Sequence, residues 1–97
     1  MKDWKACKCP ICELKICRLR EVEVENYKYE CDGCGSFIAS YETLNLNRTK
    51  IAENRGSISK YLKNYFEEHG EALEIVDVRS DEKNKMTINQ ILEHCDR

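Results

Sequence analysis

The stretch "CPICELKICRLREVEVENYKYECDGC" (residues 9–34) begins and ends with two cysteines that are separated by two residues. Structural Zn²⁺ sites hold the metal in a four-coordinate tetrahedron in which thiolate sulfur is a preferred ligand. The two-residue spacing lets one tight turn aim both sulfurs of a pair at a single point. The 18 residues between the pairs suffice for a β-hairpin that returns the second pair to the first. The spacing therefore predicts one metal site with four ligands: Cys9, Cys12, Cys31 and Cys34.

The turns that carry these pairs contain residues that suit them. Pro10 fixes the backbone of the first turn, and Gly35 permits the positive φ that often follows the second pair. This is the arrangement of a zinc ribbon. Four cysteines close the coordination shell, so we expect a structural Zn²⁺ and a chain that is not an enzyme. A thioredoxin-like dithiol is the alternative, but it would need a single CxxC at the start of a helix, and neither pair has that setting.

The other cysteines and both histidines are expected to lie outside the metal site. Cys7 is predicted to be a spare surface thiol near the metal, and Cys17 to be a core residue of the first strand. Cys95 falls on the apolar face of the last predicted helix. His69 and His94 each stand near a helix end, where a histidine commonly caps carbonyl groups or covers apolar surface.

The composition is that of one small domain. The 97 residues include seven cysteines and carry a formal net charge of −2, and no apolar run has the length of a signal peptide or a membrane span. Many cysteines without such a leader indicate metal or redox chemistry rather than a set of disulfides. We therefore expect a soluble, cytoplasmic protein with Zn²⁺ as its cofactor and with no membrane partner.

The hydrophobic pattern predicts an α+β fold. β-Branched residues favour a strand at 14–24, and period-two alternation favours strands at 26–31 and 36–42. Helical spacing, capping residues and a buried apolar run predict a helix, a strand and a helix in the second part, at 57–69, 72–79 and 87–95. We predict a zinc ribbon at 1–42, a small antiparallel sheet, packed with a helix-strand-helix segment at 43–97.

The stretch "KIAENRGSISKYLKNYF" (50–66) is similar to a helix-turn-helix. Ala52 matches the small residue of the first helix and Gly56 the turn glycine, although Arg55 occupies a position that is usually apolar. Such a motif would expose Ser59, Lys60, Lys63 and Asn64 to nucleic acid. A basic stripe near the N-terminus offers further phosphate contacts at Lys8, Lys15, Arg18 and Arg20. A solvated charged face without a partner is the alternative interpretation.

The order of these features resembles the N-terminal zinc-ribbon modules of uncharacterised bacterial and phage-associated proteins, including defence-type effectors. The matching residues are Cys9 to Cys12, Cys31 to Gly35, Phe37 to Ser40, Arg55 and Ser59 to Leu62. Glu13 departs from that pattern, which commonly has glycine there. A looser resemblance is to zinc-binding antitoxins, in which a ribbon binds a protein and a helix-turn-helix binds DNA.

These resemblances imply a recognition or adaptor module that is often attached to something larger. We expect a non-catalytic binding module whose partner is a protein or the remainder of a larger chain. A DNA- or RNA-binding regulator is the alternative, and no small-molecule substrate is evident.

Overall fold

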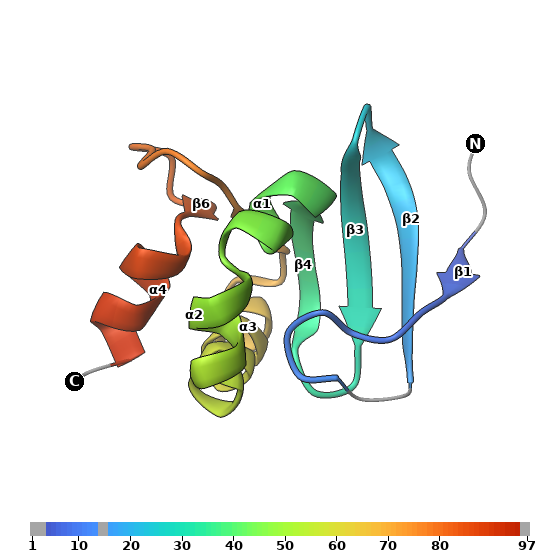
Figure 1. Ribbon diagram of the computed structural model, residues 1–97, viewed down its shortest axis with the longest axis horizontal. Coiled ribbons are helices and arrows are strands. Elements are labelled where there is room, and N and C mark those ends of the chain that lie inside the picture. Colours follow the sequence, from blue (N-terminus) through green and yellow to red (C-terminus); the bar gives the residue numbers. More distant parts are fainter. Residues whose placement is uncertain (1–3, 14–15, 96–97) are drawn as a thin grey trace.

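The computed structural model describes residues 4–13 and 16–95 of the chain. Within these ranges it has a six-stranded sheet and four helices, which confirms the predicted α+β class. The helices gather beside the β4 end of the sheet, and β1 forms the far edge (Figure 1).

The first four strands form an antiparallel meander, as the alternating sequence predicts. These strands are β1 (Lys5–Ala6), β2 (Cys17–Glu23), β3 (Asn26–Cys31) and β4 (Gly35–Ser40). The first predicted strand began at residue 14, but positions 14–15 lie outside the described residues and β2 begins at Cys17. The two-residue strand β1 was not predicted, because so short a segment carries no period-two signal.

Two further strands extend this antiparallel meander and make the sheet mixed, which the sequence did not predict. Strand β5 (Leu73–Ile75) pairs parallel to β4, and β6 (Lys85–Met86) pairs parallel to β5. The strand predicted at 72–79 is thus only three residues long. Leu73 and Ile75 share one face of β5 and are buried on the side that contacts α3, whereas Glu74 on the other face is half-buried.

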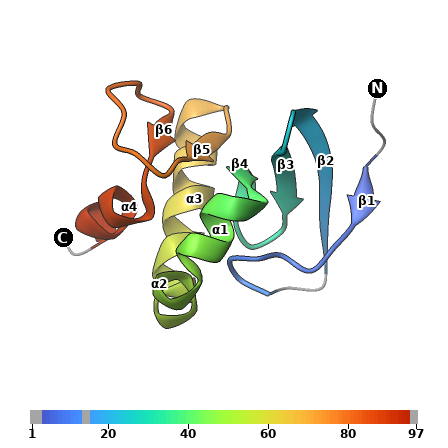
Figure 2. The same ribbon diagram turned by 45° about the horizontal axis from the view of Figure 1, so that its top comes forward.

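The chain crosses from β4 to β5 through three helices, α1 (Tyr41–Leu46), α2 (Arg48–Glu53) and α3 (Arg55–His69). Helix α3 packs against the sheet and buries Ile58, Leu62 and Tyr65. It begins two residues before the predicted N-cap, and Gly70 ends it in the predicted left-handed conformation, with φ of 69°. Helix α4 (Ile88–Cys95) lies on the side of α3 that faces away from the meander (Figure 2).

The last helix begins with the predicted capping box. Thr87 Oγ1 accepts a hydrogen bond from the Gln90 amide at 3.1 Å, and Gln90 Oε1 accepts one from the Thr87 amide at 2.9 Å. Ile88 and Ile91 are buried on its inner face. Cys95 is half-buried at the edge of the core, where its thiol donates to the Ser57 carbonyl at 3.4 Å.

The helix-turn-helix prediction was wrong. Only Asn54 separates α2 from α3, whereas that motif joins its helices with a turn of three or four residues. Ala52, expected to pack against the second helix, is exposed, and Gly56 lies inside the first turn of α3 rather than in a loop. The Asn54 carbonyl already accepts the helical hydrogen bond from the Ile58 amide at 3.0 Å, so the chain kinks here without making a loop.

Candidate metal centre

The four cysteines of the two predicted pairs meet at one end of the sheet. Their sulfur atoms all lie within 4.8 Å of one another. The distance from Sγ to Sγ is 3.7 Å for Cys9 and Cys34, and 3.3 Å for Cys12 and Cys31. A tetrahedron with metal–sulfur bonds of about 2.3 Å has edges of about 3.8 Å. This donor set therefore fits a tetrahedral thiolate site and could hold Zn²⁺ with little movement of the sulfurs.

The first cysteine turn is closed by Glu13, at the position where glycine was expected. Its amide donates to the Cys9 carbonyl at 3.0 Å, and its φ of 61° lies in the left-handed region that favours glycine. Its carboxylate pairs with Lys8 Nζ at 3.0 Å and with Arg55 Nε at 3.3 Å. The hydrogen bond from Lys8 and the charge of Arg55 hold the pKa of Glu13 below its usual value. The two cations thus favour this side chain in spite of the unfavourable backbone.

Arg55 also ties the first cysteine turn to the start of α3. Its guanidinium donates to the Ile11 carbonyl at 2.8 Å and to the Pro10 carbonyl at 3.3 Å. The side chain of Ile11 is itself fully buried and belongs to the hydrophobic core. Arg55 therefore provides hydrogen bonds to two carbonyls of the first cysteine turn, a role that the helix-turn-helix interpretation did not include.

The second cysteine turn is held by α3 and by its own backbone. The Gly33 amide donates to Cys31 Sγ at 3.3 Å. The Ser59 hydroxyl donates to the Gly33 carbonyl at 2.9 Å, and it accepts from Cys34 Sγ at 3.3 Å. Gly35 has the predicted positive φ, 71°, and a Cβ placed there would lie 3.2 Å from Cβ of Phe66. Glycine is needed here both for the conformation and for the close approach of α3.

One sulfur of the cluster is predisposed to be a thiolate. A hydrogen bond from Cys34 lowers the pKa of Cys9 to about 5, although burial of the site acts in the opposite direction. The same hydrogen bond and burial raise the pKa of Cys34, because a second negative charge next to the first is unfavourable. A bound cation would remove this conflict, since metals are held by the deprotonated form of cysteine.

The described residues of the predicted nucleic-acid surface lie on β2, on α3 and at the first cysteine turn. Ser59 was expected on the exposed face of its helix, but it is buried against the second cysteine turn. Lys60, Lys63 and Asn64 are exposed on α3, and Lys63 Nζ lies 3.4 Å from the Asp32 carbonyl. Lys8 is paired with Glu13, and Lys15 lies outside the described residues.

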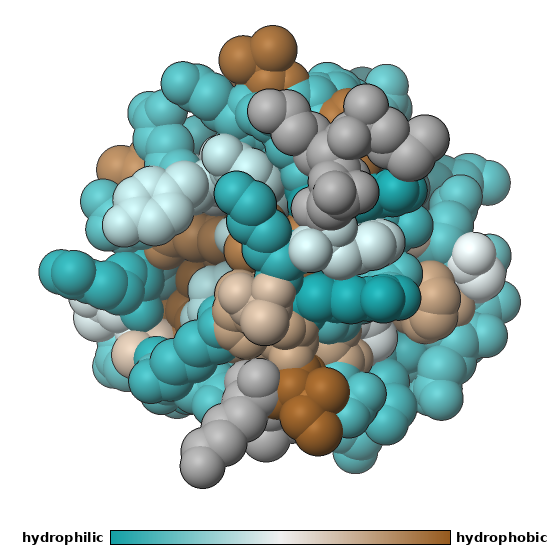
Figure 3. Space-filling view, turned by 90° about the vertical axis from the view of Figure 1, so that its right-hand side faces the viewer, coloured by the Kyte–Doolittle hydropathy of each residue, from teal (hydrophilic) through white to brown (hydrophobic). Residues whose placement is uncertain are grey.

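Two of the predicted cations lie on β2, beside a tryptophan. The guanidinium carbons of Arg18 and Arg20 are 4.6 Å and 4.9 Å from the centroid of the Trp4 ring. Alternate residues of a strand share a face, which places both guanidiniums on the same side of the sheet. Arg18 also forms an ion pair with Glu30 at 2.6 Å. Hydrophilic side chains cover most of this edge of the molecule, and hydrophobic ones form separate patches (Figure 3).

Cys7 and Cys17 form a second pair of sulfurs near the metal site. Cys17 is buried, as predicted. Cys7 is not the spare surface thiol that was expected, because it is half-buried and its Sγ lies 3.3 Å from that of Cys17. Neither belongs to the four-sulfur cluster.

The two histidines cover tyrosine rings. His69 lies 4.3 Å from Tyr65 and His94 lies 5.6 Å from Tyr61, measured between ring centroids.

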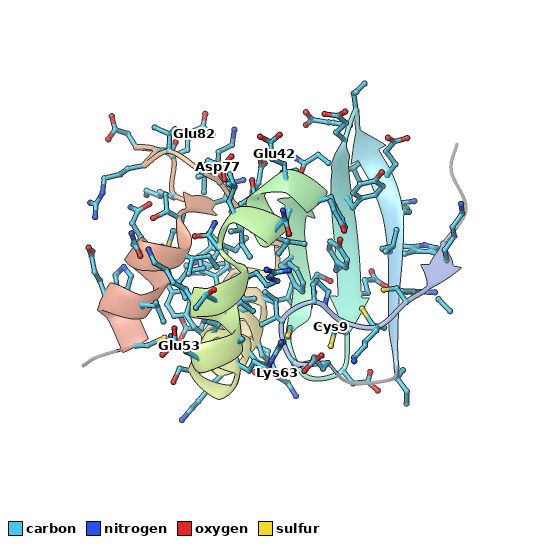
Figure 4. All side chains as sticks on the ribbon, viewed as in Figure 1. Cys9, Glu42, Glu53, Lys63, Asp77 and Glu82 are labelled. Carbon is cyan, nitrogen blue, oxygen red and sulfur yellow. The ribbon has the colours of Figure 1, made fainter. Side chains whose placement is uncertain are left out.

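A groove at the other end of the sheet was not predicted from the sequence. It has a volume of about 560 Å³ and is formed by the β2–β3 hairpin, the start of α1 and the segment from Glu74 to Asp77. Figure 4 shows Glu42 and Asp77 at this end and Cys9 at the opposite end. The groove is lined by five carboxylates, from Glu23, Glu25, Glu42, Glu74 and Asp77. No local signal could reveal it, because its acids come from three separate segments.

Comparisons with known proteins identified no relative of this chain. No family model matches the chain, and no curated protein or solved structure gives a significant match. Among the residues that the structure describes, no helix is both long enough and apolar enough to cross a membrane.

Proposed function

We propose that this chain is a non-catalytic binding module, that a structural Zn²⁺ at its four cysteines holds it together, and that its partner is a protein. The zinc assignment rests on the four converging sulfurs. The structural role follows because such a donor set leaves no open position for water or substrate. The free energy of metal binding would then largely be free energy of folding. Elemental analysis should find one zinc per chain, and a strong chelator should unfold the protein. Less than half a zinc per chain, with no unfolding by chelator, would refute this part of the proposal.

The acidic groove carries the proposal of a protein partner. Among the described residues that line the groove, none is lysine or arginine. Lys85 stands opposite Glu74 in the β5–β6 pairing, but its ammonium is paired with Glu82 at 3.0 Å. Two exposed apolar side chains, Val24 and Tyr41, stand at the groove, 90% and 75% exposed. Carboxylates beside exposed apolar groups suit a polypeptide segment that has both basic and apolar side chains.

Reversal of charge in the groove tests this partner. The double variant Glu42→Lys/Asp77→Lys changes the groove by four charge units. Since an exposed ion pair contributes about 0.2–1 kcal/mol, a basic peptide should bind this variant about tenfold or more weakly. The matched control is Glu53→Lys/Glu67→Lys, which makes the same change at exposed helix positions outside the groove. The measurement is fluorescence anisotropy of a labelled peptide rich in lysine, arginine and leucine, at two salt concentrations.

If the groove is the binding site, the control double variant should bind the labelled peptide as tightly as the unmodified protein does. Equal weakening of both double variants would show that only the net charge matters. Capture from a nuclease-treated lysate by the unmodified protein, but not by the groove variant, would extend the result to natural partners.

Nucleic acid is a second candidate partner, favoured by the position of Trp4 beside two arginines. Indole rings stack on unpaired bases, and guanidiniums bind phosphate. Without a helix-turn-helix, this candidate depends on the β1–β2 face alone. It predicts that a single-stranded oligonucleotide binds at low salt, and that Trp4→Ala and Arg20→Ala each weaken the binding. Absence of binding at low salt would leave only the protein partner.

A further inference from the structure

The pair Cys7 and Cys17 lies where a disulfide can form without disturbing the sheet. The β1–β2 register pairs Ala6 with Arg18, so the next residues, Cys7 and Cys17, face each other. The Cys7 amide donates to the Cys17 carbonyl at 3.0 Å, which keeps the two backbones at hydrogen-bonding separation. Opposed residues of this kind have Cα atoms about 5.5 Å apart, inside the range of about 4.4–6.8 Å that disulfides use.

The two sulfurs are already in contact. Cys7 Sγ lies 3.3 Å from Cys17 Sγ, and a disulfide would bring them to about 2.05 Å. This change needs a small rotation of the side chains and no movement of a strand. Cys17 has one other cysteine opposite it, Cys31 across the β2–β3 pairing, but the sulfur of Cys31 belongs to the four-cysteine cluster. Cys7 is therefore the neighbour with which Cys17 can react while the metal ligands stay in place.

We propose that Cys7 and Cys17 are a site of reversible oxidation, at which a hydroperoxide converts the two thiols to a disulfide beside the intact metal centre. Cys7 is half-buried and Cys17 is 6% exposed, so the peroxide meets Cys7 first. The Cys7 sulfur attacks the peroxide, the O–O bond breaks, and a sulfenic acid and one water or alcohol are formed. The Cys17 sulfur then displaces the hydroxyl group, which leaves as water with the remaining thiol proton. Two electrons pass from the two sulfurs to the peroxide.

The disulfide would enclose the first cysteine turn in a ring. The cross-link joins positions 7 and 17, and both Cys9 and Cys12 lie between them. Such a ring restricts the unfolded chain around two metal ligands. The oxidised protein should therefore release its metal to a chelator more slowly than the reduced protein does. This inference goes beyond the proposed function and does not depend on which partner occupies the groove.

Trypsin separates the relevant cysteines, so the site can be mapped directly. Cleavage after Lys5, Lys8, Lys15 and Arg18 puts Cys7 in the peptide 6–8, Cys17 in 16–18, and both Cys9 and Cys12 in 9–15. The purified full chain with its bound metal is treated with hydrogen peroxide at a few equivalents, remaining thiols are alkylated, and the digest is analysed by mass spectrometry. We expect a mass loss of about 2 Da, from two hydrogens, and a linked pair of peptides 6–8 and 16–18 that a reductant separates.

Two variants complete the test. Cys7→Ser should abolish the linked pair and keep the metal content, whereas the control Cys95→Ser, which changes a cysteine on α4, should preserve the linked pair. A first cross-link that involves peptide 9–15 or the peptide with Cys31 and Cys34 would overturn the proposal. Full alkylation of Cys7 and Cys17 at the peroxide dose that oxidises the ligand cysteines would also overturn the proposal. Metal content is measured on the same sample, so failure of the zinc assignment is seen separately.

Discussion

Removal of the Ser59 hydroxyl tests whether α3 holds the second cysteine turn in place. Ser59 is only 8% exposed, and its oxygen lies 2.9 Å from the Gly33 carbonyl and 3.3 Å from Cys34 Sγ. The hydroxyl donates to the carbonyl and accepts from the Cys34 thiol, and alanine can do neither. Ser59→Ala therefore leaves a buried polar group without its partner, which costs about 1–3 kcal/mol.

This cost should appear in the affinity for the metal. Because about 1.4 kcal/mol corresponds to a tenfold change in an equilibrium constant, the structural estimate is about a 5- to 150-fold loss. Groups that orient metal ligands from the second layer of a site typically contribute 10- to 100-fold, which is the same range. The assay is competition for Zn²⁺ with a chromophoric chelator of known affinity, together with circular dichroism to verify that α3 still forms.

The matched control is Ser57→Ala, two residues earlier on the same helix. Ser57 is exposed, and its carbonyl accepts a hydrogen bond from the Cys95 thiol, a contact that alanine retains. Ser57→Ala should change the affinity by less than about twofold. Equal affinities of the two variants would refute the reasoning that α3 supports the metal centre through this hydroxyl.

Two further predictions concern glycine conformation and the core. Gly35 and Gly70 both have φ near 70°, but a Cβ at Gly35 would crowd Phe66 at 3.2 Å whereas one at Gly70 meets nothing within 4 Å. Gly70→Ala should thus lower the free energy of unfolding by about 1–2 kcal/mol, and Gly35→Ala should lower it by at least about 1 kcal/mol more. Urea denaturation measures both values, and equal losses would contradict the close approach of α3. Phe37 is fully buried, so Phe37→Ala should cost about 3–5 kcal/mol, against about 0.5 kcal/mol or less for Tyr41→Ala at a residue that is 75% exposed. A loss below about 1 kcal/mol for Phe37→Ala would show that its ring is not part of the core.

Features that depend on a few neighbouring residues were predictable. The two CxxC pairs identified the four sulfurs that converge, and the capping box at Thr87 and Gln90 located the start of α4. The left-handed residues at Gly35 and Gly70 were also visible, because a positive φ favours glycine wherever it occurs. In each case the physical requirement is met within about one turn of the chain.

Glu13 shows the limit of such local rules. The sequence places a charged residue where a left-handed conformation is needed, and nothing adjacent in the chain explains it except Lys8. Its second partner, Arg55, comes from the start of α3; in the sequence it was a departure from the helix-turn-helix pattern and also one match to the zinc-ribbon modules. The structure shows what this arginine does, because its guanidinium donates to two carbonyls of the first cysteine turn.

By itself the sequence determined which four cysteines converge, the α+β class, the end of α3 and the start of α4, since spacing and capping act over short distances along the chain. Only the tertiary structure decided that Ser59 faces a cysteine turn, that Cys7 meets Cys17, and that acids from three segments form one groove. It also decided the parallel pairing of β4, β5 and β6. Each of these contacts joins segments whose distance in sequence says nothing about their distance in space, so it depends on how the packed sheet and helices bury their apolar faces together.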